Sequence, residues 1–325
     1  MAVLVTGAAG FIGSHVAHAL LDRGEAVIGL DDLNDYYEVS LKEARLSRLE
    51  QRGGFRFRCL DIADREAITA FFSEYADIDR VVHLAAQAGV RYSLVNPYVY
   101  LRSNIDAHVV LLEQVRRVDR FIHFVYASSS SVYGANRTMP FSTDDRTDHP
   151  VSLYGATKKA MEVISDSYAA MYGLPITGLR FFTVYGPWGR PDMAACIFTR
   201  KILAGEPIPV FNHGEMRRDF TYIGDIVPGV IASLDRPPDP GAGTPHRLYN
   251  LGHHHPERLT DFIAILETAL GRTAVVDFLP MQPGDVRESY ADIASAQRDL
   301  GFEPKTPIAT GIPQFVDWYR AYYGV

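Results

Sequence analysis

The feature that most constrains the fold is a set of glycines, each three residues after the last, near the start of the chain. Gly7, Gly10 and Gly13 follow a short β-branched segment, "AVLVTG", and begin a segment with helical periodicity, "FIGSHVAHALLDRG". A second short apolar segment, "AVIGLDD", comes next. A strand, a glycine-rich turn, a helix and another strand form a βαβ unit, which places both strands parallel in one sheet.

The same alternation continues to about residue 180. Apolar segments suited to strands occur at "FRFRCLDI", "RVVHLAA", "RFIHFVYASS" and "PITGLRFF", and helical patterns cover residues 64–75, 97–117 and 153–172. Alternation of this kind predicts an α/β fold with a Rossmann-type, doubly wound parallel sheet and helices on both faces. We expect this first domain to cover residues 1–180.

The alternation breaks down after about residue 181, where Pro and Gly are more frequent and helical patterns return near residues 193–204, 257–270 and 292–299. These features predict a smaller, mixed α/β domain over residues 181–325 that binds the substrate, with some later segments returning to the first domain. The segment "RPPDPGAGTP" (236–245) is typical of a surface loop.

Composition excludes several classes of protein. With 47% hydrophobic and 22% charged residues, the chain has the profile of a soluble globular protein. Its net charge of -7 and scattered basic residues argue against a nucleic-acid partner. No segment has the roughly 18 consecutive apolar residues of a membrane span. Cys59 and Cys196 lie far apart and outside any CxxC spacing, which argues against a disulfide scaffold and a zinc site and fits a cytoplasmic location. The adjacent side chains of His253, His254 and His255 cannot easily converge on one ion, so we expect no metal.

The glycine motif also predicts a dinucleotide-binding site. Glycines leave room for a pyrophosphate against the N-terminus of the helix, where unpaired N–H groups carry partial positive charge. Asp31 closes the second strand eighteen residues after Gly13. Its carboxylate is suited to accept hydrogen bonds from the adenosine ribose and to repel a 2'-phosphate, which favours NAD over NADP.

Other residues at the ends of predicted strands are expected to contact this cofactor. Asp61 and Ile62 follow the third strand, at the expected adenine contact, although an ordinary carboxylate at a strand end explains Asp61 equally well. The predicted cofactor-binding residues are Gly7, Gly10, Phe11, Ile12, Gly13, Asp31, Asp61, Ile62, Leu84, Ala85, Ala86, Tyr154 and Lys158.

Tyr154 and Lys158 are candidates for proton transfer. Their i, i+4 spacing places both side chains on one face of a helix. Making a tyrosine a base near pH 7 requires a fall in its pKa of about three units, roughly 4 kcal/mol. A nearby ammonium, helped by the positive nicotinamide of NAD, is a plausible source. The serines at 128–131 end the fifth predicted strand and complete a possible relay. A surface pair on an amphipathic helix is the alternative, but the glycine motif and the serines favour catalysis.

These segments resemble the extended short-chain dehydrogenases/reductases that act on nucleotide sugars, and among them the UDP-glucuronate 4-epimerases. The resemblance is carried by "DLNDYYEVSLK", "HLAAQAGVRYSLVNP", "SSSSVYG", "SLYGATKKA", "GLRFFTVYGPWGRPDM" and "MRRDFTYIGDIV", and the later "PGDV" with Arg287 also fits. It implies that Tyr154 is the catalytic base, that Lys158 is its partner and a ribose ligand, and that Ser129 is the serine of the relay.

The resemblance further implies an isomerase that converts UDP-glucuronate to UDP-galacturonate through a 4-keto sugar, with transient hydride transfer to tightly bound NAD. Related dehydratases and decarboxylases carry a carboxylate just before the Val-Tyr-Gly, where this chain has Ser130 and Ser131. A UDP-glucuronate decarboxylase is therefore disfavoured. A UDP-glucose/UDP-galactose 4-epimerase remains an alternative, and so does a non-catalytic NAD sensor, which would not need Tyr154, Lys158 and Ser129 together.

The same resemblance suggests which residues bind the substrate. Arg218 and Arg287 are expected at the diphosphate, with Arg217 a weaker candidate, and Ser130 is expected beside Ser129. Arg190 is a candidate to grip the uronate carboxylate and so to prevent decarboxylation of the β-keto acid, with Thr183 donating one more hydrogen bond. A cation–π contact between Arg190 and Trp188 is the alternative.

A homodimer is also expected. The helical segments near residues 97–117 and 152–171 carry apolar residues on more than one face, including Val109, Leu112, Val163 and Ile164. In relatives such helices pair two subunits as a four-helix bundle. Burial of these side chains within one subunit is the alternative.

Overall fold

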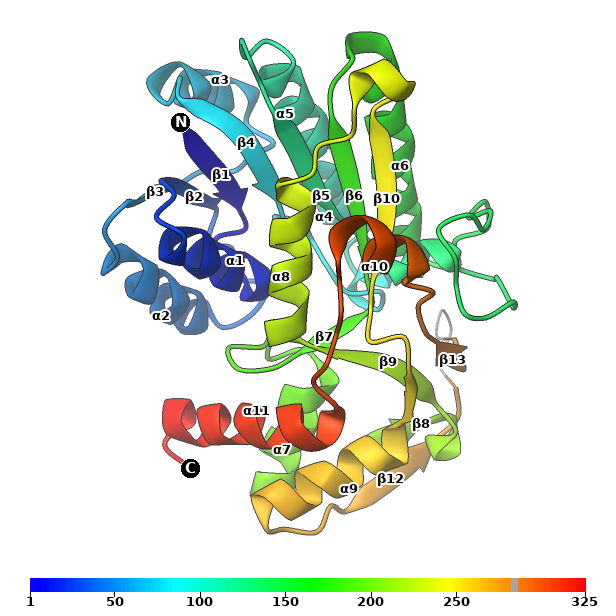
Figure 1. Ribbon diagram of the computed structural model, residues 1–325. Helices are drawn as coiled ribbons and strands as arrows, with labels where there is room; N and C mark the ends of the chain where they lie inside the picture. The colour runs from blue at the N-terminus through cyan, green and yellow to red at the C-terminus, as the bar shows by residue number, and fades with distance from the viewer. Residues whose placement is uncertain (282–285) are drawn as a thin grey trace.

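The computed structural model describes residues 1–281 and 286–325, and a seven-stranded parallel sheet forms its centre (Figure 1). The strands are β1 (Ala2–Thr6), β2 (Val27–Asp31), β3 (Phe55–Cys59), β4 (Ile78–His83), β5 (His123–Ser129), β6 (Ile176–Phe181) and β10 (His246–Leu251), in the order β10-β6-β5-β4-β1-β2-β3. The order reverses between β1 and β4. In such a sheet the crevice at the carboxyl ends of these strands is where a ligand binds.

Helices cover both faces of this sheet, because successive strand residues point to opposite sides. One face packs against α1 (Phe11–Asp22), α8 (Ile223–Leu234) and α10 (Ala294–Leu300) through Val3, Val5 and Val82. The other face packs against α3 (Arg65–Glu74), α5 (Ala107–Val115) and α6 (Leu153–Tyr172) through Leu4, Val81 and Phe124. This arrangement confirms the predicted doubly wound α/β fold.

A second region lies beyond the carboxyl ends of the large sheet (Figure 1). Its strands form two small sheets, one of β7 (Thr183–Tyr185), β9 (Arg217–Tyr222), β11 (Pro256–Arg258) and β13 (Glu288–Ser289), the other of β8 (Ile208–Phe211) and β12 (Val276–Leu279). Helices α7 (Ala194–Ala204), α9 (Leu259–Leu270) and α11 (Ile308–Tyr323) share a separate core with these strands. The chain crosses between the two regions several times, since α8, β10 and α10 return to the large sheet. The boundary at residue 180 stays a prediction.

Three helices were not predicted: α2 (Val39–Glu50), α8 and α11. Pro228 lies inside α8 and Pro313 inside α11, and a proline normally interrupts a helical pattern. Each proline is the sixth residue of its helix, so it removes one early hydrogen bond while the buried face of the helix still packs against the core. Tertiary packing of these helices therefore outweighs the tendency of proline to interrupt a helix.

The remaining elements are short. They are α4 (Pro97–Tyr100), a π-helical stretch over Leu101–Asp106, and 3-10 turns over Tyr92–Leu94, Ser130–Tyr133, Asn212–Gly214 and Pro240–Ala242. The last of these lies within the predicted surface loop 236–245, where most residues are exposed.

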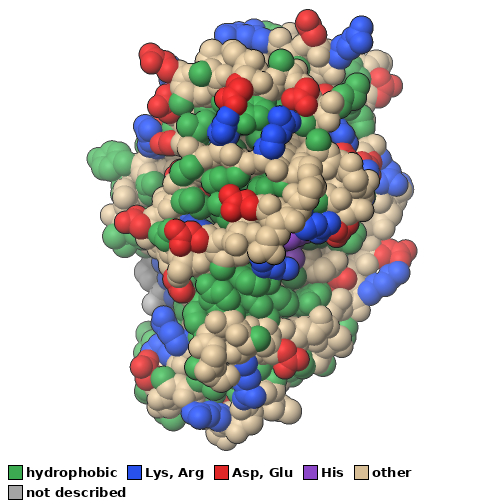
Figure 2. All heavy atoms as spheres, turned by 90° about the vertical axis from the view of Figure 1, so that its left-hand side faces the viewer, with side chains coloured by type: hydrophobic (Ala, Val, Ile, Leu, Met, Phe, Trp, Pro, Cys, Tyr) green, Lys and Arg blue, Asp and Glu red, His purple; other side chains and the backbone are tan. Residues whose placement is uncertain are grey.

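The four side chains proposed for a subunit contact differ in burial, and Val109 and Ile164 are half-buried. Leu112 is fully buried within the subunit, so the alternative explanation holds for that residue, whereas the Val163 side chain is 58% exposed. On the face shown in Figure 2, acidic and basic side chains are interspersed and do not form a patch of one sign. Among the described residues, no helix is both long and apolar enough to cross a bilayer.

Candidate active site

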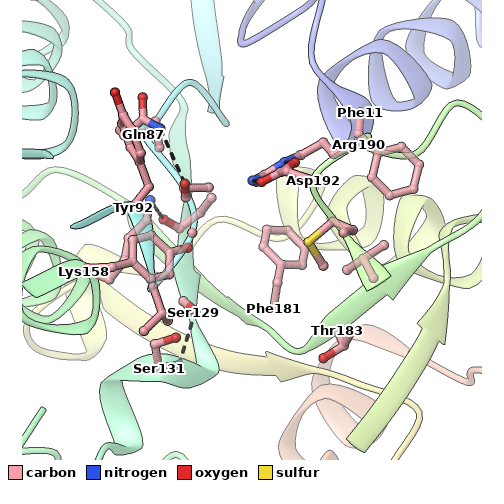
Figure 3. A pocket seen from close by; sticks show the side chains of 18 of the residues that line it. Phe11, Gln87, Tyr92, Ser129, Ser131, Lys158, Phe181, Thr183, Arg190 and Asp192 are labelled. Atoms are coloured by element: carbon pink, nitrogen blue, oxygen red, sulfur yellow. Dashed lines mark hydrogen bonds and ion pairs between the residues drawn. The ribbon is translucent and has the colours of Figure 1, made fainter. Parts of the chain in front are cut away.

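A cavity of about 950 Å³ opens at the carboxyl ends of the parallel strands, a size suited to one large or two smaller ligands. Its walls come from the turns after the strands of the large sheet and from the second region (Figure 3). All of the predicted cofactor-binding residues line it: Gly7, Gly10, Phe11, Ile12, Gly13, Asp31, Asp61, Ile62, Leu84, Ala85, Ala86, Tyr154 and Lys158. The cavity thus brings together residues that lie between positions 7 and 158 of the sequence.

The glycine turn is shaped by close backbone approaches. Gly7 has a φ of +70°, and a Cβ there would lie 2.8 Å from the backbone nitrogen of Ala85. The Gly10 N–H donates to the Gly7 carbonyl at 2.9 Å, and α1 begins at the next residue. Within the described residues no side chain caps α1 at Gly10. Its first N–H groups therefore face the cavity as donors for a pyrophosphate.

Asp31 lies beside this turn and is held in one orientation. Its Oδ2 accepts from the Ala9 N–H at 3.1 Å, and its Oδ1 accepts from the Leu33 N–H at 2.9 Å. Burial raises the pKa of the Asp31 carboxyl, while the Leu33 N–H and the Lys42 ammonium oppose the shift. The remaining lone pairs of this carboxylate are available to ribose hydroxyls at the wall of the cavity.

Asp61 and Ile62 line the cavity at the end of β3. The Asp61 Oδ2 accepts two hydrogen bonds from Arg102, at 2.7 and 3.0 Å, and its Oδ1 accepts from the Ala63 N–H at 2.9 Å. The Ile62 side chain is buried in the core. Asp61 therefore closes its strand and contributes to the cavity wall as well.

One face of α6 contacts the last three residues of β5. The Lys158 Nζ donates to the Ala127 carbonyl at 2.8 Å, and the Ser128 hydroxyl donates to Glu162 at 2.6 Å. The Ser129 side chain is hydrogen-bonded to Tyr154 and also accepts from the Ser131 N–H at 3.1 Å. Ser129, which the resemblance assigns to the relay, therefore faces the phenol, whereas Ser128 faces away from it.

Burial is the largest cause of the pKa shifts of Tyr154 and Lys158. It raises the pKa of Tyr154, against the hydrogen bond from Ser129 and the charge of Arg190. It lowers the pKa of Lys158 to about 7, and the nearby Glu162 carboxylate opposes that shift. The expected fall in the pKa of Tyr154 is thus not found in the protein alone, because desolvation of the phenol outweighs the surrounding charges.

Arg190 lies across the cavity from Lys158 and Ser129 (Figure 3). Its Nε donates to the Asp192 Oδ1 at 3.0 Å, its Nη2 pairs with the Asp192 Oδ2, and the Tyr36 hydroxyl donates to the same Oδ2 at 3.2 Å. The guanidinium lies 6.0 Å from the centre of the Tyr36 ring. The cation that lies over the Trp188 ring is instead the Arg48 guanidinium, 4.6 Å from the ring centre. The alternative explanation of Arg190 by Trp188 is therefore wrong, and no pattern in the sequence predicted the pairing of Arg190 with Asp192.

The other predicted substrate residues lie in different places. Ser130, Thr183 and Arg218 line the cavity, and the Arg218 Nη1 donates to the carbonyls of Arg217 and Arg287 at 3.0 and 3.2 Å. The Arg287 side chain is 72% exposed and pairs with Glu215 at 3.2 Å, outside the cavity wall. Most of the "PGDV" segment, residues 283–285, lies outside the described residues.

The histidine run belongs to a loop with a structural role. The backbone N–H groups of His253 and His254 donate to the buried Asp219 carboxylate at 2.6 and 3.0 Å. Among residues 1–281 and 286–325, no group of three or more His, Cys, Asp or Glu side chains is arranged to hold a metal ion.

Comparison with known proteins agrees with this geometry. Residues 3–252 match the model of the NAD dependent epimerase/dehydratase family. The chain belongs to this family.

Among curated members, UDP-glucuronate 4-epimerase 3 of Arabidopsis thaliana is 50% identical over 332 residues, which cover 99% of this chain and 77% of that protein. The crystal structure of UDP-glucuronic acid 4-epimerase from Bacillus cereus, in complex with UDP-glucuronic acid and NAD, superposes with a TM-score of 0.91 at 34% identity and covers 99% of this chain and all of that one. UDP-glucose 4-epimerase from Thermotoga maritima, solved with UDP-glucose, has a TM-score of 0.88 at 31% identity and covers 99% of this chain and all of that one.

Proposed function

We propose that this epimerase family member is an isomerase that interconverts UDP-glucuronate and UDP-galacturonate at C4 of the sugar. The observation that carries the proposal is one shared cavity, with Lys158 and Ser129 on one side, Arg190 across from them, and Tyr154 and the glycine turn among its lining residues. The Bacillus cereus relative, crystallised with UDP-glucuronic acid and NAD, supports the same substrate and cofactor for this chain.

The cavity residues fit NAD. The turn at Gly7 excludes any Cβ, the N-terminus of α1 is open to a pyrophosphate, and the oriented Asp31 carboxylate suits ribose hydroxyls and disfavours a 2'-phosphate. Bound there, NAD would accept the hydride from C4 and return it to the opposite face of the 4-keto sugar. Its positive nicotinamide would also favour the ionised form of a nearby phenol.

Side chains of the protein would transfer the proton of the C4 hydroxyl and position the cofactor and the substrate. We assign Tyr154 as the base that takes the proton of the C4 hydroxyl, with Ser129 sharing that proton through its hydrogen bond to the phenol. Lys158 would hold the cofactor ribose near the Ala127 carbonyl, to which it already donates. Arg218 and Ser130 would bind the diphosphate and the sugar, and the position of Arg287 outside the cavity wall makes Arg218 the stronger diphosphate candidate.

Arg190 supports the uronate as substrate. A guanidinium can hold carboxylates through charge-assisted hydrogen bonds; in Arg190, Nε and Nη2 are bonded to Asp192, so Nη1 would be the donor to the uronate carboxylate at the cavity wall. A fixed, charged carboxylate is kept from the alignment with the C4 carbonyl that would release carbon dioxide. Since Ser130 and Ser131 supply no carboxylic acid, these positions also argue against a decarboxylase.

A neutral sugar is the second candidate substrate, because the Thermotoga maritima relative was solved with UDP-glucose. Separate incubations with UDP-glucuronate and UDP-glucose, followed by anion-exchange chromatography, distinguish the two. We expect UDP-galacturonate from the first and at most slow conversion in the second. Release of carbon dioxide with accumulating NADH, or faster conversion of UDP-glucose, would contradict the proposal.

We also propose a homodimer formed through α6 and the segment from Pro97 onward. Val163 and Met171 of α6 are 58% and 60% exposed, and Tyr98 is 79% exposed. Light scattering of the native protein should give twice the chain mass, and Val163→Arg should shift it toward the monomer. A monomeric native protein would rule the dimer out.

A further inference from the structure

Arg45 lies in the middle of α2, one of the helices that the sequence did not predict. Its side chain is fully buried, although a guanidinium is costly to remove from water. The explanation lies in its hydrogen bonds. Nη1 donates to the Ala9 carbonyl at 3.1 Å and to the Tyr37 hydroxyl at 2.8 Å. Nη2 donates to the carbonyls of Trp188 and Gly189 at 2.7 and 3.1 Å, and Nε donates to Trp188 at 3.1 Å.

These acceptors come from three segments that are distant in sequence. Ala9 belongs to the glycine turn, Tyr37 to the loop after β2, and Trp188 and Gly189 directly precede Arg190. All of these acceptors are neutral. The guanidinium of Arg45 therefore joins backbone carbonyls and a phenol and does not neutralise a carboxylate. Arg45 therefore links the glycine turn, which lines the cavity, to the loop that carries Arg190.

The loop that Arg45 holds has an unfavourable backbone conformation. Trp188 has a φ of +64°, in the left-handed region that side chains with a Cβ rarely adopt. Such a conformation persists only where surrounding contacts impose it. Two of the five donor contacts of Arg45 go to the Trp188 carbonyl, at the residue where the chain is strained. Two residues later, Arg190 emerges at the cavity wall beside Tyr36 and Asp192.

We propose that Arg45 is a positioning residue that sets the preference for an anionic over a neutral sugar. It acts through Arg190, by keeping the 188–190 loop against the glycine turn, and contacts no substrate itself. This inference rests on the proposed function, in which Arg190 holds the uronate carboxylate. It predicts that loss of Arg45 lowers uronate preference without lowering affinity for the nucleotide.

The matched control is Arg48, one turn later on α2. Its guanidinium lies 4.6 Å over the Trp188 ring, so it touches the same loop residue from the exposed side of the helix. We therefore compare Arg45→Met with Arg48→Met. The first variant removes the hydrogen bonds to the carbonyls of the loop, whereas the second removes only packing against Trp188.

The experiment uses NAD-saturated protein carrying Tyr154→Phe, so that ligands are not turned over. Calorimetry gives the dissociation constants of UDP-glucuronate, UDP-glucose and UDP for Arg45→Met, Arg45→Lys, Arg48→Met, Arg190→Ala and Arg45→Met with Arg190→Ala. The quantity compared is the ratio of affinities for UDP-glucuronate and UDP-glucose, because a general loss of folding changes both ligands alike.

We expect Arg190→Ala to lower this ratio by about tenfold or more, in keeping with the loss of a charge-assisted hydrogen-bond pair. Arg45→Met should lower it at least fivefold while UDP binds within twofold of the parent, and Arg48→Met should change it less than twofold. The double variant should match Arg190→Ala alone, since Arg45 acts only through that residue. Arg45→Lys keeps the buried charge and serves fewer carbonyls, so it should fold and still lose preference.

Each contrary result has a distinct meaning. If Arg190→Ala leaves the ratio unchanged, the uronate role in the proposed function fails, and this inference fails with it. If Arg190→Ala lowers the ratio but folded Arg45→Lys and Arg45→Met keep it, the inference alone is overturned. The inference would also be overturned if the affinity ratio of the double variant fell by the product of the two single effects. That result would mean that Arg45 acts independently of Arg190.

Discussion

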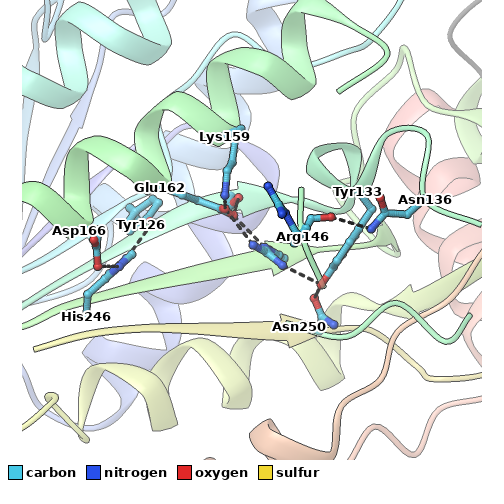
Figure 4. A network of polar contacts seen from close by, with 11 residues as sticks. Tyr126, Tyr133, Asn136, Arg146, Lys159, Glu162, Asp166, His246 and Asn250 are labelled. Carbon is cyan, nitrogen blue, oxygen red and sulfur yellow. Dashed lines mark hydrogen bonds and ion pairs between the residues drawn. The ribbon is translucent and has the colours of Figure 1, made fainter. Parts of the chain in front are cut away.

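Glu162 and Arg180 form a buried, two-pronged ion pair directly behind the end of β5. Glu162 accepts from Arg180 at 2.8 and 2.9 Å, and both side chains are 2% exposed. Ser128 donates to the same carboxylate, and the other side of the guanidinium donates to Tyr133 at 3.0 Å (Figure 4). The pair therefore connects α6, which carries Tyr154 and Lys158, to two neighbouring strands of the large sheet.

Replacing Glu162 with Gln should destabilise the fold, because it leaves the Arg180 charge buried without its partner. We expect a loss of about 3–5 kcal/mol in the free energy of unfolding, measured by urea titration. The exposed pair of Arg146 and Asp148 is the control, and Arg146→Gln there should cost less than about 1 kcal/mol. Equal effects at the two sites would contradict this account of the buried pair.

Replacing Tyr154 with Phe should abolish turnover and keep substrate binding. The phenylalanine ring fills the same space but cannot accept the proton, and a general base contributes about 100-fold or more to rate. Chromatography of the product and calorimetry with UDP-glucuronate measure the two effects. Tyr168→Phe, on the same helix but bonded to Glu113 outside the cavity, is the control and should retain the parent rate. Substantial epimerisation by Tyr154→Phe would remove Tyr154 as the base.

The stability of the NAD-free protein should increase with pH because of Lys158. Its pKa is lowered to about 7 in the folded protein from an unfolded value near 10.5, so the unfolded chain binds more protons between these values. Raising the pH through this window therefore removes a cost of folding, by about 1.4 kcal/mol per pH unit at most. Urea titrations at pH 7.5 and 9.5 should show this gain in the native protein and a smaller one in Lys158→Met. Equal gains would mean that Lys158 remains charged in the folded state.

Replacing Asp31 with Asn should weaken NAD binding and relax discrimination against NADP. The amide keeps the shape of the side chain but removes the charge that repels a 2'-phosphate and attracts ribose hydroxyls. We expect the NAD to NADP affinity ratio of the cofactor-free protein to fall by about tenfold, the effect of roughly 1.4 kcal/mol. Asp32→Asn, at the neighbouring exposed carboxylate, should change the ratio less than threefold. A similar fall in both variants would point to general charge and not to Asp31.

Local sequence patterns determined much of the fold and of one wall of the site. The helical periodicity over residues 153–172 predicted the bounds of α6, and the spacing of Gly7, Gly10 and Gly13 predicted the tight turn at Gly7. The i, i+4 spacing likewise placed Tyr154 and Lys158 on one helical face. These features depend on backbone geometry over a few residues, which the residue types themselves encode.

Only the tertiary structure decided how distant segments meet. It brought Tyr36 to the Arg190–Asp192 pair, placed Arg287 on the surface, and buried Leu112 while leaving Val163 exposed. It also kept α8 helical through Pro228 and brought Arg45 to the carbonyls of residues 188 and 189. Such contacts join groups up to 156 positions apart, as at Tyr36 and Asp192. The periodicity of apolar residues predicts which face of a helix or strand is buried. The partner of a buried polar group depends instead on how the helices and strands pack together in space.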